Sequence, residues 1–166
     1  MAHCVSDIIH NLAGKWFISR TINGENIYSG HAFLTPADFN IPKALVFFYT
    51  ESGTLSLPQG SFENFRHYTY VFFPELMHLE IYFDHQKKRL FQNIPLSHTA
   101  HGLTGHAHHD CMPDVYDSSY AFTNNSGFCI KHAVTGPKKN MIIESIYKSK
   151  LNPEPETREP HLNTYN

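Results

Sequence analysis

Residues 106–116 read His-Ala-His-His-Asp-Cys-Met-Pro-Asp-Val-Tyr and hold imidazole, thiol, carboxylate and phenol groups in one short stretch. Residues 112–114, Met-Pro-Asp, have the composition of a tight turn between two runs, 103–111 and 115–123, that read as strands. Because side chains alternate along a strand, such a unit sends half of its polar groups to each face of a sheet. If the flanking strands enclose a cavity, the inward half are candidate ligand contacts.

The run 103–111 divides into a face of small side chains and a face of large polar ones. One face holds Gly105, Ala107, His109 and Cys111, and the other holds His106, His108 and Asp110. Small side chains suit a crowded interior. We therefore expect His109 and Cys111 to point inward.

Outward from this unit, the chain continues as short apolar runs separated by turn residues such as Asn23-Gly24 and Gly136-Pro137. The expected strands are 15–22, 27–35, 43–51, 62–73, 77–83, 88–92, 103–111, 115–123, 127–135 and 139–148. The chain has 13 Phe and 9 Tyr, residues that favour pleated sheets. Closely spaced strands without helices between them predict an all-β fold, a single antiparallel meander β-barrel of about 8–10 strands.

The two ends of the chain differ from this pattern. Val5, Ile8, Ile9 and Leu12 recur at helical spacing before Gly14, which predicts a short N-terminal helix. We expect residues 1–13 to cap the barrel and residues 14–150 to form it. Residues 151–166 contain three prolines and three glutamates and almost no apolar side chains, so we expect a disordered tail.

Composition excludes several classes of partner. The chain has 13 Lys and Arg against 15 Asp and Glu, so we expect no nucleic-acid partner. No run approaches the roughly 20 apolar residues of a membrane span. Cys4, Cys111 and Cys129 lack zinc-site spacing and read as free thiols, which favours a cytoplasmic protein. The oligomeric state stays open.

Alternation also selects inward residues on other strands. In the run 62–73, one face holds Phe62, Arg66, Tyr68, Tyr70 and Phe72, and this is the expected interior. On the last two strands, His132 and Tyr147 share the inward face with aliphatic residues. Burying the guanidinium of Arg66 requires acceptors, and Asp114 is the best available partner, with Tyr116 or Tyr120 completing the network. In the run 43–51 both faces are apolar, and no orientation follows.

Several short motifs resemble lipocalin-type (calycin) barrels. Gly14-Lys15-Trp16 after a short helix is similar to the Gly-x-Trp that opens the first lipocalin strand, where the indole plugs the closed barrel end. More of the chain, residues 14–148, resembles an uncharacterised bacterial family of lipocalin-like domains. That resemblance rests on Gly14-x-Trp16 with Arg20, Arg66-x-Tyr68, His109-x-Cys111-x-x-Asp114-x-Tyr116, Gly136-Pro137-x-Lys139 and Tyr147. Phe128 and His132 stand where that family favours tryptophan. The resemblance implies a barrel and no established activity.

The leading functional hypothesis is binding of a small, largely apolar molecule, possibly one with a carboxylate, inside the barrel. The expected ligand-binding residues are Arg66, Tyr68, His109, Cys111, Asp114, Tyr116, Tyr120, His132 and Tyr147. One alternative is an enzyme (an isomerase, cyclase or hydrolase) in which His109 or His132 moves a proton. Another is a haem or metal protein, with His132 or His109 on iron or with His98, His101, His106 and His108 on a metal. No fixed metal-ligand motif is present, so we assign no metal ligands, and the cofactor stays unknown.

Overall fold

The computed structural model describes residues 4–124 and 127–149 and contains ten strands and one short helix there. The expected disordered tail lies outside the described residues. The elements are α1 (Val5–His10), β1 (Gly14–Ile22), β2 (Glu25–Pro36), β3 (Leu45–Leu57), β4 (Gly60–Phe73), a 3-10 turn (Pro74–Leu76), β5 (His78–Tyr82), β6 (Leu90–Thr99), β7 (Gly102–Cys111), β8 (Asp114–Thr123), β9 (Gly127–Thr135) and β10 (Asn140–Ser149).

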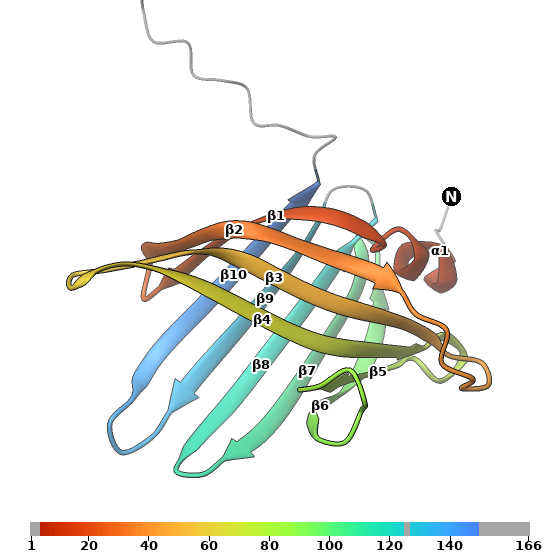
Figure 1. The fold of residues 1–166 in the computed structure, drawn as a ribbon. Helices are drawn as coiled ribbons and strands as arrows, with labels where there is room; N and C mark the ends of the chain where they lie inside the picture. The colour runs from red at the N-terminus through yellow and green to blue at the C-terminus, as the bar shows by residue number, and fades with distance from the viewer. Residues whose placement is uncertain (1–3, 125–126, 150–166) are drawn as a thin grey trace, which may run out of the picture.

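The strands form a closed antiparallel meander in which every strand pairs with its chain neighbours and β1 pairs with β10 (Figure 1). Closure removes the sheet edges that an open meander would leave unpaired. The all-β barrel expected from the strand and turn pattern is confirmed.

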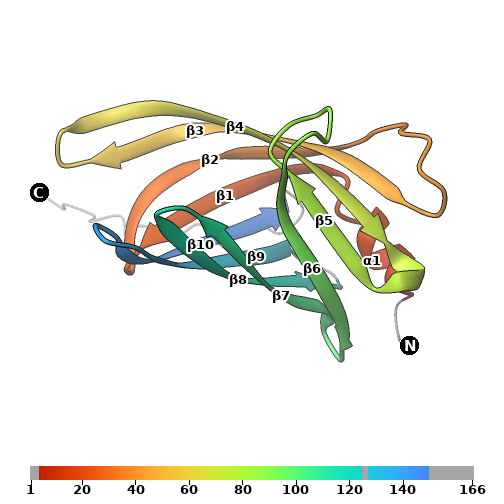
Figure 2. The same cartoon turned by 90° about the horizontal axis from the view of Figure 1, so that it is seen from below.

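The barrel widens on one side because two strand pairs are short. On β4, only residues Thr69–Phe73 pair with β5. On β6, only Leu96–Thr99 pair with β7. Among the described strands, the first part of β4 and the last part of β7 therefore each pair on one side only. The two arms of the barrel, one containing the first part of β4 and the other the last part of β7, diverge there, as seen from below in Figure 2.

The opposite end of the barrel is filled by α1 and aromatic side chains. Ile8 and Ile9 of α1 are fully buried in the core. The indole Nε1 of Trp16 donates a 2.8 Å hydrogen bond to the carbonyl of Leu12, and its ring meets Phe128 edge-on at 5.2 Å. Trp16 is buried and plugs this end, as the lipocalin resemblance implied. The space for a ligand therefore lies in the other, open half.

Strand β6 is longer than the sequence pattern predicted. The expected strand was 88–92, whereas β6 runs from Leu90 to Thr99 and continues through Pro95. Leu96 donates its N–H to Met77 on the β5 side, so the nitrogen of Pro95 faces β7, where pairing begins only at Leu96. Proline is tolerated because no ladder hydrogen bond is required of it there.

The inward prediction for Phe62 is wrong. Tyr70 and Phe72 of the same face are buried, but Phe62 is 49% exposed. It lies near the start of β4, where β4 pairs with β3 and extends beyond the end of β5. The alternation of β4 is intact, and its first residues have no opposite wall to pack against.

Candidate ligand cavity

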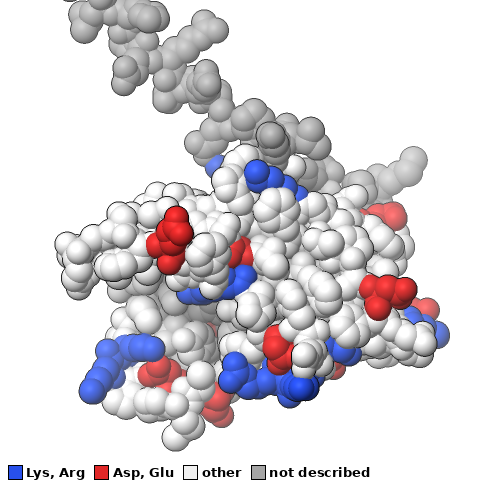
Figure 3. Space-filling model, viewed as in Figure 1, with Lys and Arg blue, Asp and Glu red and all other residues white. Residues whose placement is uncertain are grey.

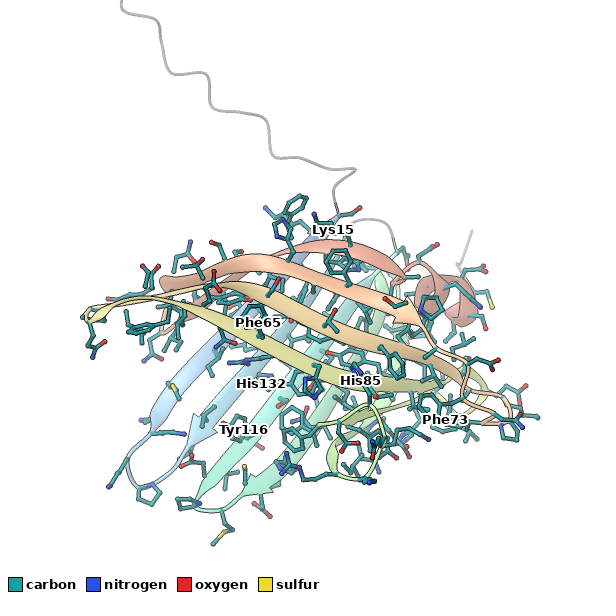
Figure 4. The ribbon with its side chains drawn as sticks, viewed as in Figure 1. Lys15, Phe65, Phe73, His85, Tyr116 and His132 are labelled. Atoms are coloured by element: carbon teal, nitrogen blue, oxygen red, sulfur yellow. The ribbon has the colours of Figure 1, made fainter. Side chains whose placement is uncertain are left out.

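A cavity of about 280 Å³ occupies the open half of the barrel. Figure 4 shows Tyr116 and His132 projecting from β8 and β9 into the space between these strands and β4. In the space-filling view, the surface is hollowed between the arms, with Lys or Arg side chains at the border of the hollow (Figure 3). The cavity is therefore accessible from solvent at this side.

The lining residues come from β1 and from β3 through β10, because inward positions alternate along each strand. Apolar walls are formed by Ile81, Phe83, Phe91, Ile130 and Ile143. Phenol groups come from Tyr49, Tyr68, Tyr70, Tyr116, Tyr120 and Tyr147. The remaining polar contacts come from Arg20, Glu51, Arg66, Cys111, His132 and Ser145.

Arg20 and Glu51 form a buried ion pair in the wall. The guanidinium donates two hydrogen bonds of 2.7 and 2.9 Å to the carboxylate, and its Nε donates a third, of 2.7 Å, to Ser145 Oγ. Tyr49 donates to Glu51 as well and lies 3.0 Å from the hydroxyl of Tyr147. The ring of Tyr28 covers Arg20 at 4.7 Å. Every charged atom of the pair has partners, which is the condition for burying it.

Both members of the pair are charged. Burial alone would raise the pKa of Glu51, but the hydrogen bonds and charge of Arg20 outweigh burial and lower it. Burial likewise opposes the charged form of Arg20, and Glu51 overcomes this and raises the arginine pKa. The network is therefore a fixed internal salt bridge at neutral pH.

Arg66 has a different environment. Its side chain is 45% exposed, and its Nε lies 4.0 Å from Glu51 Oε1, beyond hydrogen-bond distance. Glu51 already makes a bidentate contact with Arg20. The guanidinium of Arg66 thus borders the cavity without a close carboxylate of its own among the described residues.

A second polar network crosses from β6 to β9. The Tyr120 hydroxyl donates to the side-chain oxygen Oε1 of Gln92. The side-chain nitrogen Nε2 of Gln92 donates a 2.6 Å hydrogen bond to Ser118 Oγ. Ser118 Oγ lies 2.6 Å from His132 Nδ1. Burial, together with the charges of Arg20 and Arg66, lowers the pKa of His132 to about 4. His132 is therefore a neutral imidazole in the cavity wall at physiological pH.

Seven of the nine residues expected from the sequence line this cavity: Arg66, Tyr68, Cys111, Tyr116, Tyr120, His132 and Tyr147. Cys111 is exposed and stands at the rim. His109 is outside the lining and packs edge-on against Phe83 and Phe91, at 6.1 and 5.2 Å. It therefore supports the aromatic wall.

Asp114 is also outside the lining, and the predicted partnership with Arg66 is wrong. Asp114 pairs with Lys139 at 2.9 Å. The two residues belong to adjacent hairpins, at the start of β8 and just before β10, which brings them together at the open end. The carboxylate nearest to Arg66 is that of Glu51, from the neighbouring strand β3.

Sequence reasoning missed four of the residues that organise the cavity: Arg20, Tyr49, Glu51 and Gln92. In the sequence, Arg20 stands out only as part of the family motif. It shares the inward face of β1 with Trp16 and Ile18, and this alternation could have identified it. Gln92 lies in the short predicted strand 88–92, which ended before the pattern of Gln92, Ile94 and Leu96 became visible.

Within the described part of the chain, no three His, Cys, Asp or Glu side chains are grouped so that they could hold a metal ion. The His-rich outer face of β7 instead places His108 between Asp110 and Asp117, at 3.1 and 2.7 Å. None of the described helices has the length and apolarity needed to cross a bilayer.

The fold and cavity define a closed ten-stranded antiparallel barrel with a charged, aromatic-lined internal site. The chain belongs to the family of unknown function DUF6314, whose model matches residues 12–149, the whole barrel. Comparison with curated proteins and with solved structures gave no match.

Proposed function

We propose that this barrel binds a small, largely apolar molecule that carries an acidic group, with Arg66 as the anchor of that group. The observation that carries the proposal is the incomplete pairing of Arg66: among the described residues that line the cavity, the one carboxylate, Glu51, is held by Arg20. The lipocalin-like Gly14-x-Trp16 motif also supports a ligand-binding barrel, by analogy alone.

The charge of the lining favours an anion. Among the lining residues, two arginines face one glutamate, and His132 is neutral. Burial raises the pKa of Tyr68, and raises that of Tyr147 to about 12, so these phenols stay uncharged at neutral pH. The positive charge of Arg66 is thus in excess of the negative charge of the lining, and a carboxylate on the ligand would be its counterion.

The other walls suit an apolar body of limited size. Phe83 and Phe91 pack against each other with ring centroids 4.6 Å apart, and Tyr68 stacks on Phe91 at 6.0 Å. Such rings bury apolar surface and orient a flat group. A volume of about 280 Å³ is at the lower end of small-molecule sites and fits one ring with a short chain.

A matched pair of ligands tests the proposal. Phenylbutanoate and phenylbutanamide have nearly the same shape and differ in charge. We expect the acid to bind more tightly than the amide to the full-length protein in calorimetric titrations. The Arg66→Gln variant should bind the acid roughly ten- to a hundredfold more weakly, which is the contribution of a charge-assisted hydrogen bond. Its affinity for the amide should be nearly unchanged.

Lys131→Gln is the matched control. Lys131 precedes His132 on β9, is exposed and points to the outer face, so its loss removes the same charge without altering the cavity. Equal weakening of the acid by both substitutions would indicate a general electrostatic effect and would contradict an anchoring role for Arg66. Equal affinity of acid and amide for the unmodified protein would also contradict the proposal.

A further inference from the structure

The network behind His132 has a direction. A buried phenol must donate its proton, and the acceptor of Tyr120 is the carbonyl oxygen of Gln92. This contact fixes the orientation of the Gln92 amide, whose NH₂ group then donates to Ser118 Oγ. Ser118 is buried, so its own proton also needs an acceptor, and His132 Nδ1 lies 2.6 Å away.

The tautomer of His132 follows from this direction. If Ser118 donates to Nδ1, that nitrogen carries no proton, and the neutral ring must hold its proton on Nε2. The ring lies in the cavity wall, with Tyr116 at 6.0 Å and Phe91 at 6.1 Å from its centroid. The side of the ring away from Ser118 therefore presents an N–H donor.

We infer that His132 is a specificity-determining residue that donates an Nε2–H hydrogen bond to an uncharged oxygen of the ligand, so that the preferred ligand is a keto acid or related oxo acid. This inference rests on the proposed function and adds a second polar contact to it. Arg66 takes the carboxylate, and His132 takes a carbonyl elsewhere on the same molecule.

The same tautomer disfavours two other roles for His132. A general base accepts a proton through an unprotonated nitrogen, and a metal or haem iron needs a nitrogen lone pair. In the directed network, Nδ1 is occupied by Ser118 and Nε2 holds a proton. Either role would require the hydrogen bond between Ser118 and His132 to reverse, and the buried hydroxyl proton of Ser118 would then need another acceptor.

The first test reads the tautomer directly. Two-bond proton–nitrogen correlation spectra of the full-length protein at neutral pH should show Nε2 protonated and Nδ1 unprotonated for His132. The Ser118→Ala variant should move part of the population to the Nδ1-protonated tautomer, because the Ser118 hydroxyl then no longer donates to Nδ1. A protonated Nδ1 in the unmodified protein would overturn the inference, whatever ligand is bound.

The second test uses keto acids and their parent acids. Benzoylpropionate and phenylbutanoate differ by one carbonyl, as do phenylpyruvate and phenylpropionate, and the carbonyl lies at a different distance from the carboxylate in each pair. At least one keto acid should bind roughly three- to tenfold more tightly than its parent, the contribution of a neutral hydrogen bond. The His132→Leu variant should abolish this preference, and His132→Gln should restore part of it through its amide N–H.

The outcomes separate the two claims. If neither keto acid is preferred, or if the preference survives in His132→Leu, the role of His132 is wrong while Arg66-dependent binding of the parent acids still stands. If the parent acids bind no better than their amides, the proposed function itself fails.

Discussion

Arg20 of β1 and Glu51 of β3 are joined by two parallel hydrogen bonds, of 2.7 and 2.9 Å, although β2 lies between their strands. Inward side chains can meet across a strand because the barrel wall curves. This pair occupies the carboxylate of Glu51, and the same carboxylate is the nearest one to Arg66. Among the described residues, the internal salt bridge thus leaves Arg66 without a hydrogen-bonded carboxylate.

Removing the charge of Glu51 should destabilise the fold strongly. Glu51→Gln leaves the buried Arg20 without a counterion, which typically costs about 3–5 kcal/mol. Urea denaturation followed by circular dichroism measures the change. Glu75→Gln is the control, because Glu75 pairs with Lys43 on the surface and its loss should cost less than about 1 kcal/mol. Similar losses for both variants would contradict a structural role for the internal pair.

His132 should make the protein acid-sensitive. Its pKa is about 4 when folded and 6.5 when unconstrained, so the unfolded chain binds the additional proton between these values. Stability is therefore expected to fall as the pH drops from about 6.5 towards 4, by at most about 3 kcal/mol. Below 4.5, Glu51 adds a further loss, because its folded pKa is lowered from that value.

Comparing the unfolding free energy of the unmodified protein and His132→Gln between pH 6.5 and 4.5 isolates this effect. In the His132→Gln variant, the slope of the unfolding free energy against pH should be mostly lost in that window. His106→Gln, an exposed change on the outer face of β7, should retain the slope because His132 is still present. A slope that persists unchanged in His132→Gln would show that another group is responsible.

Trp16 should affect stability and not ligand binding. Trp16→Phe removes the hydrogen bond to Leu12 and part of the contact with Phe128, which should cost about 1–3 kcal/mol. Because Trp16 lies at the closed end, the affinity for phenylbutanoate should stay the same. Thermal unfolding and calorimetric titration of one preparation measure both quantities. A large drop in affinity with no change in stability would contradict the division into a closed and an open half.

Asp114 should be dispensable for binding. Its partner is Lys139, at the rim of the barrel, and it is outside the cavity lining. Asp114→Asn should therefore leave phenylbutanoate affinity unchanged, whereas Arg66→Gln lowers it. If the two substitutions weaken binding equally, Asp114 contributes to the site through a contact that the present geometry does not contain.

Alternation and turn chemistry were sufficient to predict most of the barrel, because inward and outward side chains differ wherever one face meets solvent. Strand β3 is one exception. Its outer face is also apolar because Phe39 packs on Phe48 at 5.6 Å and His85 stacks on the same ring at 4.3 Å. With both faces covered, no local pattern could show that Glu51 points inward.

The candidate site was predictable only in part, for a related reason. Tyr68 and His132 stand beside apolar or aromatic inward positions and are visible from the sequence, and Tyr116 is visible as part of the family motif. The partners of Arg20 and Arg66 were not, because pairing between β1, β3 and β4 depends on register and curvature. Residue type alone favours Asp114 as the partner of Arg66, but Asp114 lies near the turn before β10 and pairs with Lys139 instead.

The most direct measurement of the central claim is a crystal structure of the full-length protein with bound phenylbutanoate. We expect the carboxylate within hydrogen-bond distance of the Arg66 guanidinium, with the phenyl ring against Phe91 inside the barrel. A ligand bound on the outer surface, or bound in the cavity with its carboxylate away from Arg66, would contradict the account.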